Sequence, residues 1–319
     1  MKILVTGAAG FIGSNVVDGY VKAGHDVLGV DNLFTGKRSN VNPKARFYEM
    51  DVRSPEVAAL IKRERPDVLN HHAAQISVPA SVSDPFLDAD INIRGLLNLL
   101  ESSVRYGVGK FIFISSGGAI YGEAPEYPTS EACQPRPLSP YAVSKYSSEH
   151  YLAYYKHQYG LNFTTLRYAN IYGPRQIPHG EAGVVAIFMD NILRGERSTL
   201  YHFQDDEVGM IRDYCYVADV VKANLSAVEK GGGDFFNIGT GLGTKTQALY
   251  ELIYETFKQV RPGISQELDI LNRQIARPGD VPRSCLTVEK ARRLLGWYPD
   301  NDLRQGINKT LEWRLNRSL

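Results

Sequence analysis

The sequence predicts an α/β fold: a Rossmann-type doubly wound parallel sheet with a smaller, discontinuous C-terminal domain. Three observations support this prediction. Short apolar segments alternate six times with helix-patterned segments over residues 1–168, an order typical of parallel sheets. A glycine-rich loop joins the first apolar segment to the first helical one, as in nucleotide-binding sheets. The alternation then breaks after Tyr168, where proline and glycine punctuate residues 173–183.

Each element follows from its local pattern. Strands are expected at the short runs of buried-type residues, Lys2–Thr6, Asp26–Val30, Phe47–Met50, Val68–His71, Phe111–Ser115 and Asn162–Arg167. Helices are expected at Phe11–Ala23, Val57–Arg65, Asp84–Tyr106 and Pro140–Tyr159. The second helix stops before Pro66, because a residue that precedes proline disfavours helical backbone. The last helix has a proline in its first turn, where the missing N–H does no harm.

The order of elements also predicts the domain boundaries. We assign residues 1–168 to the sheet domain, with a segment near residues 212–238 returning to it. Residues 169–211 and 239–319 are assigned to the second domain. In such folds ligands bind in the crevice outside the carboxyl ends of the strands, so we expect the second domain to cover that edge.

Composition excludes several classes of protein. The 319 residues carry a net charge of +1 and are 43% hydrophobic and 22% charged, which is typical of a globular protein without a nucleic-acid footprint. Cys133, Cys215 and Cys285 contain no CxxC pair, which indicates free thiols. The seven histidines form no ligand motif, so we expect no metal. No apolar run approaches the roughly 20 residues of a membrane span and no signal peptide is visible, so we expect a cytoplasmic protein.

The glycine loop predicts a dinucleotide site. Gly7, Gly10 and Gly13 follow the first strand and open the first helix, where backbone N–H groups can approach a pyrophosphate. Asp31 ends the second strand, eighteen residues after Gly13, at the position of an acid that binds the adenosine ribose. A carboxylate there repels a 2′-phosphate, so the cofactor is expected to be NAD, not NADP. The alternative is that Asp31 is only a turn residue before Asn32.

A second motif predicts acid–base chemistry. Tyr141 and Lys145 lie one helical turn apart near the start of the helix at residues 140–159. A phenol has a pKa near 10, and an adjacent ammonium together with a positive nicotinamide would favour its ionised form. The pair could also be an ordinary surface pair, but it follows Ser115 and Ser116 at the end of the fifth strand. That position places it above the carboxyl edge of the sheet.

With these motifs the chain resembles the UDP-glucose 4-epimerase family, extended members of the short-chain dehydrogenase/reductase superfamily. The glycine spacing Gly-x-x-Gly-x-x-Gly is the first point of resemblance. The matching segments are Thr6–Gly13, Val30–Leu33, His72–Gln75, Ile114–Gly122, Tyr141–Lys145, Leu166–Gln176, Arg212–Asp219 and Arg277–Pro282. The resemblance implies tightly retained NAD, a UDP-sugar substrate, and a homodimer formed through a four-helix bundle. It also implies that the sheet domain binds NAD and the second domain binds the UDP-sugar.

The resemblance further implies roles for individual residues. Tyr141 would be the acid and base at the 4-hydroxyl of the sugar, and Lys145 would bind the nicotinamide ribose. The family's third catalytic hydroxyl would fall on Gly117 when counted back from Tyr121, and on Ser116 when counted along the strand; we choose Ser116, with the extra glycine forming a bulge. The implied cofactor-binding residues are Gly7, Gly10, Phe11, Ile12, Gly13, Asp31, Asn32, Asp51, Val52, Ala73, Ala74, Gln75, Asn92, Ser115, Tyr141, Lys145 and Tyr168. The implied substrate-binding residues are Asn170, Arg212, Arg277, Asp280 and Ser284.

Departures from related families narrow the expected reaction. The 4,6-dehydratases carry Asp-Glu, and the glucuronate decarboxylases a glutamate, where this chain has Gly118 and Ala119. Neither can transfer a proton, which favours 4-epimerisation of UDP-glucose and UDP-galactose. The resemblance aligns Ser284 with a residue that gates the sugar pocket in the family, and a small gate implies that N-acetylhexosamines also enter. Residues 203–211 depart from the family's usual uridine loop. Two alternatives stay open: a UDP-glucuronate 4-epimerase, in which Arg175 or Arg277 would meet the carboxylate, and a non-catalytic NAD-binding regulator.

Overall fold

A computed structural model of the protein describes residues 1–178, 183–276 and 280–316. Its main feature is a seven-stranded sheet with the strand order β10-β6-β5-β4-β1-β2-β3, in which every neighbouring pair is parallel. The strands are β1 (Lys2–Thr6), β2 (Asp26–Asp31), β3 (Arg46–Glu49), β4 (Val68–His71), β5 (Lys110–Ser116), β6 (Phe163–Tyr168) and β10 (Asp234–Ile238). The predicted fold class is confirmed.

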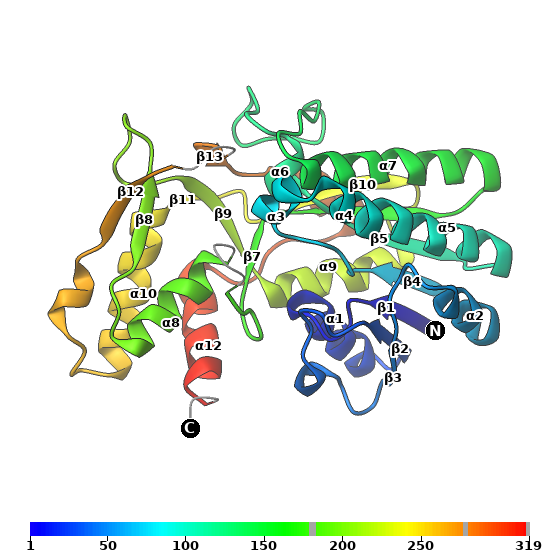
Figure 1. Ribbon diagram of the computed structural model, residues 1–319, viewed down its shortest axis with the longest axis horizontal. Coiled ribbons are helices and arrows are strands. Elements are labelled where there is room, and N and C mark those ends of the chain that lie inside the picture. The colour runs from blue at the N-terminus through cyan, green and yellow to red at the C-terminus, as the bar shows by residue number, and fades with distance from the viewer. Residues whose placement is uncertain (179–182, 277–279, 317–319) are drawn as a thin grey trace.

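Helices cover both faces of this sheet (Figure 1). On one face α1 (Phe11–Lys22) packs beside α9 (Val217–Glu229) and near α11 (Glu289–Leu295). On the other face α2 (Pro55–Glu64), α5 (Gly95–Tyr106) and α7 (Pro140–Tyr159) lie side by side. The strands contribute fully buried residues to both cores, which explains why they read as continuous apolar runs. Short 3₁₀ turns, η1 (Arg38–Asn40) and η3 (Gln266–Asp269), lie in the connections.

The single helix expected over Asp84–Tyr106 is wrong in detail. The chain forms α3 (Val78–Ser83), α4 (Pro85–Ala89), a π-helical segment at Asp90–Arg94 (η2) and then α5. Asp84 ends α3 and caps α4, because its side chain accepts a hydrogen bond from the Leu87 N–H at 2.9 Å. Pro85 stands at the first position of α4, where it cannot continue the preceding helix. The apolar spacing therefore predicted helical backbone but not the break.

A second group of elements lies beyond the carboxyl ends of the sheet (Figure 1). Here β9 (Ile211–Tyr216) pairs with β7 (Asn170–Tyr172), β11 (Gly243–Lys245) and β13 (Arg283–Ser284). A separate pair is formed by β8 (Thr199–His202) and β12 (Asn272–Ile275). The helices α8 (Val184–Arg194), α10 (Thr246–Val260) and α12 (Leu303–Leu315) share one apolar core with β7 and β9. The segment from Val217 to Ile238 returns to the seven-stranded sheet as α9 and β10.

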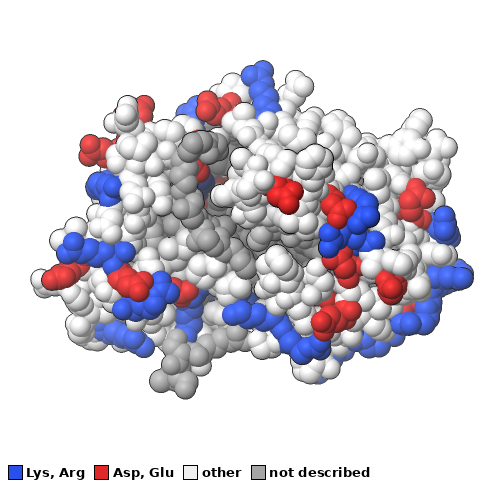
Figure 2. All heavy atoms as spheres, in the orientation of Figure 1, with Lys and Arg blue, Asp and Glu red and all other residues white. Residues whose placement is uncertain are grey.

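Charged side chains are interspersed over the face seen in Figure 2, where basic and acidic residues alternate without a patch of one sign. This distribution agrees with the net charge of +1. None of the helices in the described ranges is long and apolar enough to span a membrane. In the same ranges no group of three or more His, Cys, Asp or Glu side chains could hold a metal ion.

Candidate functional site

The loop between β1 and α1 is shaped for an anion. Gly7 has a φ of +67°, and a Cβ at Gly13 would lie only 2.1 Å from the Gly7 carbonyl oxygen, so neither position can carry a side chain. α1 begins after Gly10 without a side-chain cap and without an acidic residue in its first turn. The N–H groups at Phe11 and Ile12 therefore lie at an uncapped helix end, which favours negative charge. A dinucleotide pyrophosphate fits this loop.

Asp31 lies beside the glycine loop at the end of β2. Its side chain is buried, and its two oxygens accept hydrogen bonds from the Ala9 N–H at 3.0 Å and the Leu33 N–H at 2.8 Å. Burial raises the pKa of Asp31, and the backbone hydrogen bonds oppose that shift. The bond to Leu33 is a turn contact, but the bond to Ala9 ties the carboxylate to the loop. The Gly10 N–H also acts on the carboxylate, and the lone pair that remains can accept from a ribose hydroxyl.

The other residues expected around the adenosine cluster nearby. The Asn32 side chain donates to an Asp51 oxygen at 3.0 Å, and Arg53 contacts the same carboxylate at 2.8 Å. The pKa of Asp51 is lowered well below its ordinary value, chiefly by the hydrogen bonds from Arg53. Val52 is buried beneath them. The residues expected to bind the cofactor therefore gather along the carboxyl ends of β1, β2 and β3.

Tyr141, Lys145 and Ser116 come together at the carboxyl end of β5. α7 begins at Pro140, capped by Ser139, so Tyr141 lies in the first turn and Lys145 in the second. The Lys145 Nζ lies 5.9 Å from the centre of the Tyr141 ring and donates to the Ile114 carbonyl at 3.0 Å. The Ser116 side chain is hydrogen-bonded to Tyr141. A phenol, a hydroxyl and an ammonium thus form one cluster, as their spacing predicts.

Burial governs the ionisation of this cluster. It raises the pKa of Tyr141 to about 12, and the hydrogen bond with Ser116 lowers it. Burial also lowers the pKa of Lys145 to about 8, and the negative charge of Asp88 raises it. His71 and His72 lie close to Lys145 with their pKa values lowered, mainly by burial, to about 3 for His72. Both imidazoles are therefore neutral at pH 7.

One part of the expected tuning is not seen in this structure. We expected the Lys145 ammonium to lower the pKa of Tyr141, but the hydrogen bond that lowers it comes from Ser116, and Asp88 acts against it. The reason is the position of the Lys145 Nζ, which is bonded to the Ile114 carbonyl and faces the Phe113 ring at 5.1 Å. The remaining expected contribution, that of the positive nicotinamide, belongs to the loaded enzyme.

Gly117 has no room for a side chain, which bears on the choice between Ser116 and Gly117. A Cβ at Gly117 would lie 2.5 Å from Leu286 Cδ1, and Leu286 is fully buried. The bulge that we expected at Gly117 does not form. β5 runs to Ser116, and residues 117–120 form a short helical turn, α6 (Gly117–Ile120), because Leu286 packs directly against the Gly117 backbone. Of the two positions, only Ser116 presents a hydroxyl to Tyr141.

Gln75 and Asn92, both expected to bind the cofactor, bind each other. The Asn92 Oδ1 accepts from the Gln75 N–H, and the Asn92 Nδ2 donates to the Gln75 carbonyl, both at 3.0 Å. Both side-chain amides also donate to Asp88, which is only 1% exposed. Ala73 is fixed in the same loop, its N–H donating to Thr6 at 3.1 Å. These contacts fix the conformation of the loop after β4, so a cofactor bound there would contact a preorganised surface.

Sequence reasoning missed Asp88. The acid stands inside a stretch that was interpreted only as an amphipathic helix, and its spacing matches no motif. The available signal was an acid at a position where the apolar periodicity of the stretch calls for a buried residue. The π-helical segment between α4 and α5 obscured that periodicity, because its wider turn shifts the spacing of Asp88 relative to the apolar residues of α5.

Asn170 and Tyr168 line the next part of the edge. Tyr168 ends β6 and lies directly opposite Ser116 in the sheet. Its pKa is raised well above the ordinary value by burial, and its hydroxyl accepts from Asn224 at 2.6 Å. The Asn170 Nδ2 is buried and has no hydrogen-bond partner. Such a donor normally finds an acceptor, so the Asn170 amide is available to an oxygen of a bound ligand. The Ser115 Oγ is likewise buried without a hydrogen-bond partner.

Arg212, Asp280 and Ser284 come together on the substrate side. Ser284 lies opposite Arg212 in the pairing of β13 with β9, and the charge of Asp280 acts on Arg212. The Arg212 guanidinium donates to the Ile211 carbonyl at 2.9 Å and contacts the Met210 sulfur at 3.0 Å. Burial lowers its pKa. The Ile211 carbonyl and the Met210 sulfur carry no charge, so the guanidinium can still pair with a phosphate. Arg277 lies outside the described residues.

Arg175 is already occupied by a protein partner. It adopts a φ of +74°, and its Nη2 lies 2.6 Å from a carboxylate oxygen of Asp18 on α1. The arginine therefore joins the segment after β7 to the first helix of the sheet domain. In this position its charge is balanced by Asp18, while its Nη1 is buried without a hydrogen-bond partner.

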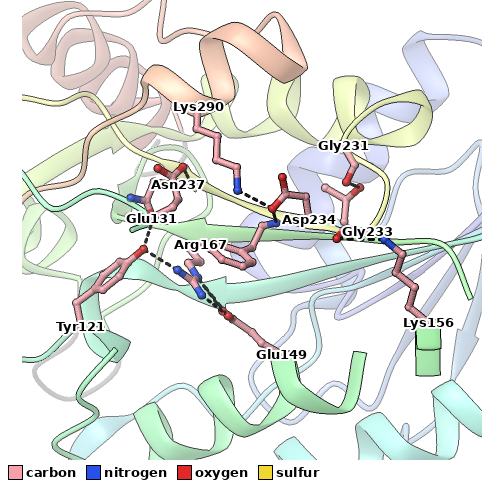
Figure 3. A network of polar contacts seen from close by, with 12 residues as sticks. Tyr121, Glu131, Glu149, Lys156, Arg167, Gly231, Gly233, Asp234, Asn237 and Lys290 are labelled. Atoms are coloured by element: carbon pink, nitrogen blue, oxygen red, sulfur yellow. Dashed lines mark hydrogen bonds and ion pairs between the residues drawn. The ribbon is translucent and has the colours of Figure 1, made fainter. Parts of the chain in front are cut away.

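A buried polar network fixes the loop between α6 and α7 (Figure 3). The Arg167 guanidinium forms a buried ion pair with Glu149 on α7 and donates to the Tyr121 hydroxyl at 2.7 Å. The Tyr121 hydroxyl donates to Asn237 on β10 at 2.9 Å, and the Asn237 N–H donates to Glu131 at 2.8 Å. The loop is thereby fastened to the last strand of the sheet.

The same loop is tied to the substrate side. Thr129 donates its N–H to the Cys285 carbonyl at 2.8 Å and accepts from the Thr287 N–H at 2.9 Å. The Leu286 N–H donates to Asp213 at 3.3 Å. The residue before Asp213 is Arg212, and the residue before Cys285 is Ser284. The contacts therefore link the catalytic end of β5 to the residues expected to bind the substrate.

Comparisons with known proteins agree with this geometry. Residues 3–239 match the model of the NAD dependent epimerase/dehydratase family. The chain is 42% identical to a UDP-glucose 4-epimerase of Mycolicibacterium smegmatis, over the full length of both proteins. A Thermotoga maritima UDP-glucose 4-epimerase, solved with UDP-glucose, has a TM-score of 0.93 and 48% identity with full coverage of both chains. A Thermus thermophilus UDP-glucose 4-epimerase in complex with NAD has a TM-score of 0.90 and 44% identity, covering 98% of this chain and 99% of that one.

Proposed function

The chain belongs to the NAD dependent epimerase/dehydratase family, and on that premise we propose that it interconverts UDP-glucose and UDP-galactose as an NAD-dependent isomerase. The observation that carries the proposal is the cluster of Tyr141, Ser116 and Lys145 at the end of β5. It lies in a chain that resembles UDP-glucose 4-epimerases over its full length. The intact cluster argues against a non-catalytic regulator. The higher identity to UDP-glucose 4-epimerases than to a UDP-glucuronate 4-epimerase argues against a glucuronate enzyme.

NAD, when bound, supplies a hydride acceptor and returns the hydride later in the same turnover. The uncapped α1 end with Gly7, Gly10 and Gly13 would hold its pyrophosphate, and Asp31 would hold its adenosine ribose. Lys145 would turn from the Ile114 carbonyl to the nicotinamide ribose. The glycine turn, the uncapped end of α1 and the buried Asp31 carboxylate support this assignment.

Tyr141 is assigned the proton transfers. Its phenolate would take the proton of the sugar 4-hydroxyl as the 4-carbon is oxidised, and the resulting phenol would return that proton to the 4-oxygen when the 4-carbon is reduced from its other face. Ser116 donates a hydrogen bond that stabilises the phenolate, which is the direction in which it moves the Tyr141 pKa. Since burial and the charge of Asp88 outweigh Ser116 and leave that pKa at about 12, the positive nicotinamide and the reoriented Lys145 ammonium would have to supply the shift towards neutral pH.

The surrounding residues explain why the product is a stereoisomer. Gly118 and Ala119 offer no acid or base for elimination or decarboxylation. The UDP part would be anchored by Asn170, Arg212, Arg277 and Asp280, while the sugar turns between its two faces. We include in the proposal that Ser284, a small residue next to Arg212, admits N-acetylhexosamines. A preference for UDP-galactose over UDP-N-acetylgalactosamine above about a thousandfold in kcat/KM, about 4 kcal/mol of transition-state discrimination, would contradict it.

The proposal extends to assembly and location. We infer a homodimer in which α5 and α7 of two copies form a four-helix bundle. It is supported by the exposed aromatic side chains Tyr151, Tyr154 and Tyr159 along α7, which are 37%, 50% and 48% exposed. Residues 1–168 with the returning segment would form the NAD domain, and the remainder the UDP-sugar domain. The three free cysteines support a cytoplasmic location.

The test is turnover without added cofactor. The purified protein should carry bound nicotinamide and convert UDP-galactose to UDP-glucose, measured by chromatography of the two sugars. Tyr141→Phe should lower kcat by about 10²–10⁴-fold, the contribution of a positioned acid–base group, and retain its bound NAD. Tyr146→Phe, on the same helix but outside the cluster, is the matched control and should keep its activity. Full activity of Tyr141→Phe would refute the mechanism.

A further inference from the structure

Asp88 is a buried acid that no part of the proposed mechanism uses. It lies on the five-residue helix α4 and is 1% exposed, although its neighbours Phe86 and Leu87 are 88% and 45% exposed. A carboxylate in such a place is unfavourable unless hydrogen bonds and a nearby positive charge stabilise it. Its position beside α7 therefore needs an explanation.

Three neutral donors from three different elements satisfy the Asp88 carboxylate. One oxygen accepts from the Gln75 Nε2 at 2.8 Å and from the Asn92 Nδ2 at 3.0 Å. The other accepts from the Ser144 Oγ at 2.6 Å. Gln75 follows β4, Asn92 lies in η2, and Ser144 is the residue before Lys145 on α7. The carboxylate thus joins the loop expected to face the cofactor to the helix that carries the catalytic pair.

The charge of Asp88 acts on both members of that pair. It raises the pKa of Lys145 and that of Tyr141, because a nearby negative charge favours the protonated form of each. The other titratable groups that face Lys145 are His71, the last residue of β4, and His72, which follows it; their pKa values are lowered by burial, so that they are neutral.

The remaining charges on the elements packed against α4 are balanced locally. On η2, Asp90 is ion-paired with Arg53 and with Arg94. α3 contributes no charged residue, since its sequence is VPASVS. α7 contributes Tyr141 and Lys145 themselves. Its Glu149 is ion-paired with Arg167, and His150, Lys156 and His157 follow further along the helix. Asp88 is therefore the charge on this side that both catalytic groups share.

We propose that Asp88 is a positioning residue and the fixed counter-charge of the site. Its carboxylate holds the side chains of Gln75, Asn92 and Ser144 together, and its negative charge favours the protonated forms of Tyr141 and Lys145, so that the enzyme requires a higher pH for activity. The inference rests on the proposed roles of Tyr141 and Lys145. In the resting state Asp88 balances the buried ammonium. When the cofactor adds a second positive charge, Asp88 limits how far the phenol is acidified.

Asp88→Asn tests the charge, and Ser144→Ala is the matched control. Asparagine keeps the size of the side chain but removes its charge, so the acid limb of the kcat–pH profile should move to lower pH by about one unit, the scale on which a neighbouring charge shifts a pKa. Ser144→Ala removes one hydrogen bond and keeps the charge, so it should lower the plateau without moving the limb. A lower plateau for Asp88→Asn with an unmoved limb would reduce Asp88 to a structural residue and overturn the proposal.

A stability measurement tests the counter-charge without relying on activity. In Lys145→Gln the Asp88 carboxylate loses its positive neighbour, in Asp88→Asn the ammonium loses its negative one, and in the double variant neither charge remains. The melting temperature of the double variant at pH 7 should therefore be higher than the sum of the two single effects predicts. Strict additivity of the two effects would overturn the counter-charge.

The outcomes separate the two proposals. An inactive wild type, or an active Tyr141→Phe, counts against the proposed reaction. An active wild type and an inactive Tyr141→Phe, together with an unmoved pH limb in Asp88→Asn, count against the role of Asp88 alone.

Discussion

Gly117→Ser gives a sharp test of how the end of β5 is built. A Cβ at this position would lie 2.5 Å from Leu286 Cδ1 and 3.2 Å from the Arg167 carbonyl oxygen. Contacts under 3.0 Å require one side to move, and Leu286 is 1% exposed within the cluster that contains Ile120 and Tyr121. Its backbone is also held, since its N–H donates to Asp213. The added side chain has no space to enter.

Overpacking of this kind costs about 1–3 kcal/mol. In a protein of this size that corresponds to a fall in melting temperature of about 2–6 °C, measured by thermal unfolding followed by circular dichroism. Gly118→Ala is the matched control, because a Cβ there meets nothing closer than 3.9 Å. It should leave stability unchanged or raise it by up to about 1 kcal/mol, since alanine restricts the unfolded chain.

Positions 117 and 286 are far apart in the sequence but in contact, so substitutions at the two should be energetically coupled. Leu286→Ala alone should cost about 2–5 kcal/mol through the cavity that it leaves, but in the Gly117→Ser background the serine occupies part of that cavity. The double variant should therefore be more stable than the sum of the single effects by about 1–3 kcal/mol. Gly117→Ser with an unchanged melting temperature, or strict additivity with Leu286→Ala, would refute the assignment of Leu286 as the group that excludes a side chain at 117.

Three further predictions follow from buried polar groups. Ser116→Ala removes the hydrogen bond that lowers the pKa of Tyr141, so the acid limb of the kcat–pH profile should move to higher pH; an unmoved limb would exclude Ser116 from the site. Burial lowers the pKa of Lys110 to about 8, so between this value and its ordinary 10.5 the unfolded state binds more protons and stability rises with pH. Lys110→Met should therefore raise the melting temperature at neutral pH and lose that gain towards pH 10.5; a gain independent of pH would contradict the shift. Glu149→Leu leaves the buried Arg167 without its carboxylate and should cost about 3–5 kcal/mol in urea unfolding, most of it recovered in the double variant with Arg167→Met; no recovery would show that the network, not the unpaired charge, carries the loss.

Much of the fold follows from local pattern. β1, β4 and α7 begin and end at the predicted residues, because their limits are marked by turns, prolines or charged residues that directly adjoin them in the sequence. The glycine loop and the Tyr141–Lys145 pair are local as well, so their spacing alone places them at one edge of a parallel sheet. These are the parts of the site that a sequence can predict.

The parts that were missed depend on residues far away in the chain. The turn that begins at Gly117 replaces a bulge because Leu286 packs against it. No residue near Gly117 in the sequence predicts this contact. The role of Asp88 depends on donors from Gln75, Asn92 and Ser144, which the fold brings together from three elements. The hydrogen bond from the Lys145 ammonium to the Ile114 carbonyl likewise joins residues that are distant in the sequence. Spacing predicts which residues are near an edge, but not which groups they bind.

The return of the chain to its own sheet has a consequence for synthesis on the ribosome. β6 ends at Tyr168, but its outer neighbour β10 begins at Asp234, after the whole segment between them has been translated. Until then a nascent chain exposes the edge of β6, and α1 lacks the cover of α9. An open edge of this kind invites pairing with other chains. The first 168 residues therefore cannot complete their own fold as they emerge. A messenger RNA truncated there would yield an aggregation-prone fragment, not a folded domain.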